Sequence, residues 1–497
     1  MRSVIASLRG KGVLSARLSP AVAAVLLATT LVGCAVSGHL DEQVASLPDI
    51  AKPADPNPAA QREHQRILVA YGGAYENPRV EALISKTVDR LVASSERPDL
   101  HYKVTILNSP AINAFALPNG HLYVTRGLVA LANDTSELSS VLSHEMAHVI
   151  ARHAAIREDQ IRIAALRSRV ATDLFNDPQM GALALAKSKI ALATFSRGQE
   201  LEADGIGVGI SSRAGFDPYG GVRFLSAMER SAELKPAAGA LAADPKYLDF
   251  LSSHPATPDR IKVTQANARQ YSGPGRGERD RSEYLDSING LVYGEDPSEG
   301  FVRGRRFLHP RLGFVFTAPD GFVLDNTSQA VLGMDASGND ALRLDVVQVS
   351  ADQRLTDYLT SGWIENVEPG TVRDMTVNGL AAATGVAKGD QWTFRLYALR
   401  FGADVYRFIF ATKQPSPEED QAFRDSIDSF RRMTATEIQT AKPLRVHVVT
   451  VKAGDTPELL AGQMAVQDRA LERFLILNGL QPSDHLKPGD QVKVVSE

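Results

Sequence analysis

The sequence predicts a multidomain protein: a mainly α-helical domain with a small sheet, then an α+β domain, then a small βααβ module. Three observations support this prediction. The chain has 497 residues, more than a single hydrophobic core usually serves. Its hydrophobic pattern changes near Gly300 from helical spacing to short strands. A Gly-rich, highly charged stretch over residues 271–281 lies before that change and is typical of a break between domains.

We expect the chain to be organised as a signal peptide over 1–34, a tether over 35–60, the mainly α domain over 61–270, a linker over 271–299, the α+β domain over 300–435 and the βααβ module over 443–497. The net charge is −4 at pH 7, with acidic and basic residues interspersed. This composition gives no indication of binding to nucleic acid or to an anionic membrane surface.

The pentapeptide His144-Glu145-Met146-Ala147-His148 is the strongest indication of chemistry in the chain. Residues four apart lie on one face of a helix, so His144 and His148 can each offer a ring nitrogen to one zinc ion. Glu145 would lie beside the metal, where its carboxylate can take a proton from zinc-bound water. We therefore expect one zinc ion per chain, with Glu145 as the general base.

The residues before the pentapeptide indicate the start of a helix. Asp134 is suited to the N-cap position and Glu137 to the third helical position, as in a capping box. Apolar residues then recur at helical spacing: Leu138, Val141, Leu142, Val149 and Ile150. We expect this helix to be packed into a core that holds both histidines rigidly.

A catalytic zinc site needs a third protein ligand, because its fourth position is kept for water. A histidine six residues after His148 is excluded, since that position is Ala154. His153 follows His148 by five residues, about 140° around a continuing helix. We therefore expect His153 to be a residue of the polar face.

The run from Phe195 to Gly205 offers a glutamate instead. Glu200 and Asp204 are four residues apart and share a helix face, whereas Glu202 points elsewhere. We interpret Glu200 as the third ligand and Asp204 as the carboxylate that orients a zinc-bound histidine, with Glu202 as the next candidate ligand. Three glycines in this stretch suit a close approach to the zinc helix: Gly205, Gly207 and Gly209.

Together these motifs resemble peptidase family M48, which includes CAAX prenyl proteases, HtpX heat-shock proteases and soluble periplasmic relatives of the BepA type. The resemblance covers about residues 61–270. It implies a mainly α gluzincin-type zinc peptidase domain with a small edge-strand sheet. Membrane-spanning members carry hydrophobic helices around the site, and this sequence, which has none there, resembles the soluble branch.

A pair of short strands before the zinc helix also resembles the family. The first is Asn113-Ala114-Phe115-Ala116, and a Pro-Asn-Gly turn separates it from the second over residues 120–124. The resemblance implies that the first strand, at Asn113, Ala114 and Phe115, aligns the substrate by adding it as a further strand.

Residues 253–261 resemble the closing His-Pro…Arg motif of the family. His254 is a candidate for a fourth metal ligand, which would displace the catalytic water and close the site. Alternatively, His254 contacts the substrate or stabilises an oxyanion with help from Arg260. A third interpretation is that His254 only caps a following helix that carries Arg260.

The amino-terminal residues resemble a bacterial lipoprotein signal. Basic residues precede an apolar run from Pro20 to Val32 that is too short to span a bilayer comfortably. The run leads into a lipobox-like Gly33-Cys34, so Cys34, the only cysteine, would become the lipidated first residue. The alternative is a free thiol beside an ordinary cleavage site. We expect a lipid anchor on the periplasmic side of the envelope, at the outer membrane.

Residues 300–435 contain four runs typical of strands: Phe314–Phe316, Leu342–Val347, Trp392–Tyr397 and Val405–Phe410. A helix from Pro417 to Arg432 is expected to close the unit, which faintly resembles PsbP-type α+β modules. No cluster of histidine, cysteine or carboxylate residues is apparent in the sequence of this segment, which favours an accessory or packing domain.

Residues 443–497 resemble a LysM module, a βααβ fold that binds N-acetylglucosamine chains in peptidoglycan. Pro457-Glu458 departs from the usual pattern, although proline is acceptable in a first helical turn. Glycan binding and a LysM-like packing role both remain possible interpretations.

The sequence therefore predicts a lipid-anchored zinc endopeptidase that degrades misfolded or unassembled envelope proteins. One alternative is a chaperone-like assembly factor. Another is a peptidoglycan-binding lipoprotein with a dormant peptidase, against which the intact set of His144, Glu145, His148 and Glu200 argues.

Overall fold

The computed structural model describes residues 58–160, 162–163, 195–234, 254, 258–327, 330–466 and 469–497. The expected signal peptide, Cys34 and nearly all of the tether lie outside these residues, and so does the sequence on either side of His254. In the described part of the chain, no helix is long and apolar enough to cross a membrane.

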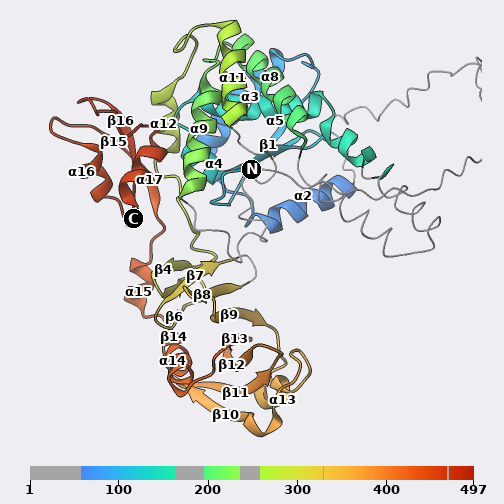
Figure 1. The fold of residues 1–497 in the computed structure, drawn as a ribbon, viewed down its shortest axis with the longest axis vertical. Helices are drawn as coiled ribbons and strands as arrows, with labels where there is room; N and C mark the ends of the chain where they lie inside the picture. The colour runs from blue at the N-terminus through green and yellow to red at the C-terminus, as the bar shows by residue number, and fades with distance from the viewer. Residues whose placement is uncertain are drawn as a thin grey trace, which may run out of the picture. The chain divides into compact units, whose positions relative to one another are not determined.

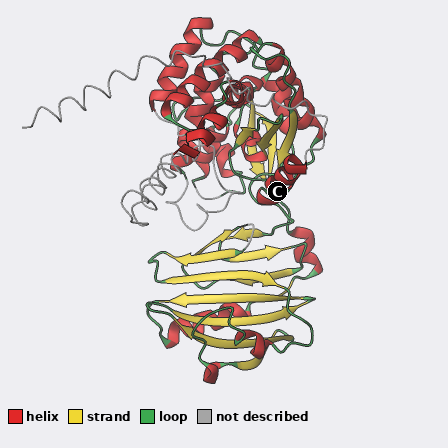
Figure 2. Ribbon diagram, turned by 90° about the vertical axis from the view of Figure 1, so that its right-hand side faces the viewer, coloured by secondary structure: helices red, strands yellow, loops and turns green. Residues whose placement is uncertain are grey.

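Helices make up most of the region up to residue 288 (Figure 1, Figure 2). They are α2 (Pro58–Ala70), α3 (Pro78–Ala93), α4 (Arg126–Leu131), α5 (Thr135–Ile150), α8 (Arg197–Arg213), α9 (Gly220–Glu233), α11 (Pro258–Tyr271) and α12 (Arg281–Ile288). Their sheet has three strands, β1 (Lys103–Leu107), β2 (Ala114–Ala116) and β3 (His121–Thr125). The strand order is β1-β3-β2, with β1 parallel and β2 antiparallel to β3, so β2 lies at an edge.

Helix α5 lies in the middle of this region and packs against α3, α8, α9 and β2. Every residue from Thr135 to Val149 except Ser140 is buried. The apolar spacing in the sequence correctly predicted one buried side. The polar residues of the other side are buried as well, because a second set of helices covers them. A helix enclosed in this way holds its side chains rigidly.

A β-rich region follows, as Figure 2 shows. Its seven-stranded antiparallel sheet has the order β10-β11-β12-β13-β9-β8-β7, and a four-stranded sheet has the order β14-β6-β5-β4. The strands are β4 (Phe301–Arg303), β5 (Arg306–His309), β6 (Phe314–Thr317), β7 (Phe322–Asn326), β8 (Val331–Asp335), β9 (Asp340–Val347), β10 (Arg373–Val377), β11 (Leu380–Lys388), β12 (Thr393–Phe401), β13 (Asp404–Thr412) and β14 (Arg431–Arg432). Short helices are α13 (Leu355–Leu359), α14 (Pro417–Asp428) and α15 (Ala435–Thr440).

The expected closing helix of this region ends earlier than predicted. Helix α14 stops at Asp428, and Arg431 and Arg432 pair with β6 instead. The aromatic ring of Phe430, between helix and strand, is fully buried. Burial of this ring in the sheet's aromatic core therefore prevails over continued helix formation.

The last segment has the predicted βααβ order. It consists of β15 (Arg445–Thr450), α16 (Pro457–Gly462), α17 (Ala470–Leu477) and β16 (Gln491–Ser496), with β15 antiparallel to β16. Pro457 occupies the first turn of α16, where the missing amide costs no hydrogen bond. The LysM assignment itself stays a prediction.

The stretch 271–299 differs from the expected linker. It contains α12, and Tyr284, Leu285 and Ile288 are fully buried in the core that also holds α5. Val446 of β15 and Ile476 of α17 belong to the same core. The charged residues around 271–281 suggested an exposed connection, whereas the apolar residues after them pack inside.

Candidate metal centre

Helix α5 places the histidine pair and Glu145 in the protein interior. Asp134 is the N-cap, as predicted, and its carboxylate accepts a hydrogen bond from the Glu137 amide at 2.9 Å. The second half of the expected capping box is absent, because the Glu137 carboxylate accepts from the amide of Asn133 instead. His144 and His148 are 4% and 5% exposed, so neither lies on a solvated face.

Helix α8 brings the predicted third ligand to the histidines. Ser196 and Gln199 form a complete capping box that fixes its first turn, in which Glu200 lies. A Cβ atom on Gly207 would lie 3.0 Å from the backbone nitrogen of His144, so only glycine permits this approach of α8 to α5. Gly205 and Gly209 instead face Asn267 and Tyr271, and only one of the three glycines has the predicted role.

The donor atoms of the predicted ligands are close enough to share one metal ion. The Nε2 atoms of His144 and His148 are 3.0 Å apart. The Glu200 carboxylate lies 3.6 Å from His144 Nε2 and 3.5 Å from His148 Nε2. Two ligands about 2.0–2.1 Å from a tetrahedral zinc ion are about 3.3 Å apart, so this set of nitrogen and oxygen donors fits zinc.

His254 completes the group. Its Nδ1 atom lies 2.8 Å from Glu200 Oε1 and 3.4 Å from His144 Nε2. One donor atom from each of His144, His148, Glu200 and His254 lies within 4.8 Å of the other three, and all four residues are buried. The structure thus places His254 where a fourth ligand would lie, rather than at a solvated helix start.

Two buried residues hold the ligands from behind. Asp204 Oδ1 lies 3.0 Å from Nδ1 of His144, the ring nitrogen that faces away from the other ligands. Arg260 binds both Asp204 oxygens, at 2.7 and 2.8 Å, and lies 2.8 Å from Glu200 Oε2. It also donates to the carbonyl of His254 at 3.1 Å. These contacts favour a positioning role for Arg260 over the expected contact with substrate.

His153 corrects the expectation of a polar-face residue. Helix α5 ends at Ile150, and Arg152 adopts a left-handed conformation with φ 59°, which turns the chain back. His153 is therefore 1% exposed, and its Nδ1 lies 2.9 Å from Nδ1 of His148. Its Nε2 lies 3.3 Å from the Glu202 carboxylate. No glycine or asparagine at 151–152 signals this turn in the sequence.

Comparisons with known proteins agree with this geometry. Residues 78–268 match the model of peptidase family M48. They form an M48 zinc metallopeptidase domain. The mitochondrial metalloendopeptidase OMA1 of Schizosaccharomyces pombe is 32% identical over 180 residues, which are 36% of this chain and 50% of that protein. The beta-barrel assembly-enhancing protease of Yersinia pestis is 29% identical over 243 residues, which are 45% and 47% of the two chains.

The chain spans about half the length of these curated relatives. The solution structure of cyanobacterial PsbP from Synechocystis covers 27% of this chain and 98% of its own, at 14% identity and a TM-score of 0.22. A match at this score supports no argument about the β-rich region.

Burial controls the protonation of the M48 site. It lowers the pKa values of His144 and His148, and it lowers the pKa of His254 to about 3, so the imidazoles are neutral and able to bind a metal. Burial alone would raise the pKa of Asp204, but hydrogen bonds from Arg260 and His144 lower it to about 2.

Glu145 has a different environment from the ligands. Burial, together with the negative charge of Glu200, raises the pKa of Glu145 well above its ordinary value. Its Oε1 atom accepts no hydrogen bond within the described residues, and the backbone amide of Ala116 on β2 is bonded to the same carboxylate. This arrangement leaves one oxygen available to a reacting molecule.

The edge strand β2 lies beside this base. Asn113, before the strand, is fixed by the hydroxyl of Thr125, which accepts from its amide at 2.9 Å. Ala114 is buried, whereas Phe115 and Ala116 are half-buried. Within the described residues, no strand pairs with the edge of β2 that passes Glu145.

Proposed function

We propose that the chain is a zinc-dependent endopeptidase in which His144, His148 and Glu200 hold the metal and Glu145 is the general base. The observation that carries this proposal is the convergence of three buried donor atoms from α5 and α8 at distances that suit one tetrahedral ion. Arg260 and Asp204 compensate the buried groups from behind, and the three donor atoms that face one another are left to share the metal ion.

Zinc, when bound, would activate a water molecule as a Lewis acid. Glu145 takes the proton of the attacking water on its free carboxylate oxygen and delivers it to the amide nitrogen that leaves. The position of Glu145 suits both transfers, because its Oε1 atom accepts no hydrogen bond within the described residues.

We further propose a resting state in which His254 fills the position needed by water. The 2.8 Å contact between His254 and Glu200 supports this state. Substrate pairing with β2 would be accompanied by departure of His254. His254→Ala should then keep zinc and raise basal peptide cleavage, and reduced cleavage with zinc retained would instead support a substrate contact.

The proposed substrates are misfolded or unassembled proteins of the bacterial envelope. Recognition through a free strand edge selects extended polypeptide, which such proteins expose. The Yersinia pestis relative is named for β-barrel assembly, which supports this class of substrate. Lipidation at Cys34 would anchor the enzyme on the periplasmic side, at the outer membrane.

A substrate trap tests this proposal. Envelope proteins bound to Glu145→Gln are identified by mass spectrometry and compared with those that accumulate when the protein is absent. We expect the same unassembled proteins in both sets. If the trapped proteins do not accumulate in its absence, they are assembly clients and the chain is a chaperone-like factor.

A further inference from the structure

The turn between α4 and α5 sets the direction of the helix that carries the histidine pair. Helix α4 ends at Leu131 with Ala132 as its C-cap, and its last carbonyls have no amide of their own helix to accept from. Asn133 and Asp134 follow immediately, and α5 begins at Thr135. Whatever satisfies these carbonyls therefore holds the start of α5.

Lys493, on β16 of the C-terminal module, provides that contact. Its side chain is fully buried, and Nζ donates to the carbonyls of Ala130, Leu131 and Ala132 at 2.7, 3.1 and 2.8 Å. Three backbone carbonyls thus lie within hydrogen-bond distance of the one Lys493 nitrogen. Asn478 fixes the lysine backbone by accepting from its amide at 2.6 Å and donating to its carbonyl at 2.9 Å.

Two arginines make further connections between the module and the M48 domain. Arg281 donates to the Asn133 carbonyl at 2.9 Å and to the Gln491 carbonyl of β16 at 3.2 Å. Arg230 on α9 donates to the Leu480 carbonyl at 2.7 Å. Together with the shared apolar core at Val446 and Ile476, these bonds fix the module on the domain.

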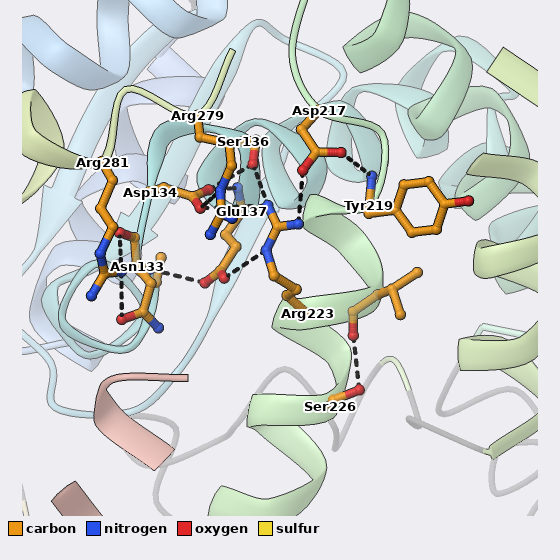
Figure 3. A network of polar contacts seen from close by, with 12 residues as sticks. Asn133, Asp134, Ser136, Glu137, Asp217, Tyr219, Arg223, Ser226, Arg279 and Arg281 are labelled. Carbon is orange, nitrogen blue, oxygen red and sulfur yellow. Dashed lines mark hydrogen bonds and ion pairs between the residues drawn. The ribbon is translucent and has the colours of Figure 1, made fainter. Parts of the chain in front are cut away.

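Buried charges at the start of α5 form a second set of contacts, with partners in the helical region rather than in the module (Figure 3). In Figure 3, Arg223 reaches from its helix toward Asp217 on one side and Glu137 on the other. The Arg223 guanidinium is 2.8 Å from Asp217 and 3.3 Å from Glu137. Arg279 donates to Asp134 at 2.7 Å. The N-cap carboxylate of Asp134 and the first-turn carboxylate of Glu137 are thus both paired, so the position of α5 also depends on partners far away in the sequence.

We propose that residues 445–496 are a fixed brace of the M48 domain, and that Lys493 is the positioning residue through which this brace secures the start of α5. The module would then be a structural part of the peptidase rather than a domain on a flexible connection. The consequence for metal binding rests on the proposed function, because α5 carries two of the proposed ligands.

Lys493→Met tests this proposal in the full-length, zinc-loaded chain, since methionine keeps the apolar stem but donates to none of the three carbonyls. Leu131 would keep a bond from the Asn133 side chain at 3.1 Å, whereas Ala130 and Ala132 would lose the Lys493 donor. Lys487→Met, at an exposed position of the same module, is the matched control. Hydrogen exchange of amides 130–137 and the rate of zinc release to a chelator are measured. We expect both rates to be about tenfold faster in Lys493→Met, because the buried carbonyls of Ala130 and Ala132 lose the Lys493 donor. Both rates should be unchanged in Lys487→Met.

Faster exchange confined to residues 445–496, with zinc release as in the wild type, would overturn the proposal. If Lys493→Met does not fold, Lys493→Gln is measured instead. Because glutamine retains two donors, we expect smaller increases in the exchange of amides 130–137 and in the rate of zinc release. The exchange comparison does not depend on catalysis. A chain that binds no zinc would therefore refute the proposed function while leaving the brace to be judged on exchange at 130–137.

Discussion

Single residues of the site differ in how far the sequence could place them. His144, Glu145, His148 and Glu200 could be predicted because helical spacing alone determines which side chains share a face. His153 could not, since its position depends on the left-handed Arg152 and hence on where the helix stops. When the end of a helix is predicted at the wrong residue, the predicted directions of the side chains after it are wrong as well.

His153 should orient His148, because a ligand's second ring nitrogen needs a partner that fixes its tautomer. Replacing His153 by Phe, of similar size, should weaken zinc binding by about 10–100-fold, measured by competition with a chelator. Glu202→Gln retains an acceptor for His153 and should have a smaller effect. Equal zinc affinity in His153→Phe and the wild type would show that His153 only fills space.

His309 should make the stability of the β-rich region depend on pH. Its Nδ1 accepts from the Leu312 amide at 3.2 Å, and burial lowers its pKa to about 4. As the pH falls, His309 takes up a proton in the unfolded chain before it does so in the folded chain. Its contribution to the free energy of unfolding is therefore fully present above about pH 6.5 and is lost as the pH falls toward 4. The loss is at most about 3 kcal/mol.

Urea unfolding followed by tryptophan fluorescence measures this effect, since both tryptophans, Trp363 and Trp392, lie in the β-rich region. His309→Phe should reduce the pH dependence, whereas His485→Gln, at an exposed position, should leave it unchanged. An identical pH dependence in His309→Phe would assign it to other groups.

Secondary-structure elements were predictable where one strong local signal exists. The Asp134 cap fixed the start of α5, and the four apolar runs identified β6, β9, β12 and β13. Strand β11 escaped prediction, because its alanine-rich sequence Leu380–Lys388 has no aromatic residue and only two β-branched residues, Thr384 and Val386. Its neighbours β10 and β12 impose the strand through backbone pairing.

Helix α8 lies so close to α5 that position 207 should accept only glycine. Gly207→Ala places a methyl group 3.0–3.2 Å from backbone atoms of His144, so it should destabilise the domain by about 1–3 kcal/mol and reduce bound zinc. Gly205→Ala meets only ordinary contact and should be neutral or stabilising, because alanine favours helices. Thermal unfolding and zinc content measure both. Full zinc content and unchanged stability in Gly207→Ala would contradict the close packing.

For the whole molecule, the order of regions could be predicted, and their packing could not. A change of hydrophobic period near Gly300 marks the passage from the helical region to the β-rich region. The βααβ order was expected from the resemblance of residues 443–497 to a LysM module. No local sequence pattern predicts that Lys493 binds the carbonyls of residues 130–132, more than 350 residues earlier in the chain. Long-range contacts of this kind depend on the assembled fold.

Anchoring at Cys34 is a prediction for the intact protein in a Gram-negative cell. Cys34→Ser should abolish labelling by a radioactive fatty acid and should release the protein from membranes in a salt wash. Ser37→Ala, three residues further on, serves as a control for the neighbourhood of the cleavage site. Retention of Cys34→Ser on washed membranes would place the anchor elsewhere.

The central claim is that one metal ion is held by His144, His148 and Glu200 while Glu145 acts only as the base. Zinc content and peptide hydrolysis, measured on the same purified samples, test it most directly. Glu145→Gln should keep one zinc per chain and lose hydrolysis by at least about a hundredfold, whereas Glu200→Ala should lose the metal. Wild-type hydrolysis in Glu145→Gln, or full zinc content in Glu200→Ala, would contradict this account.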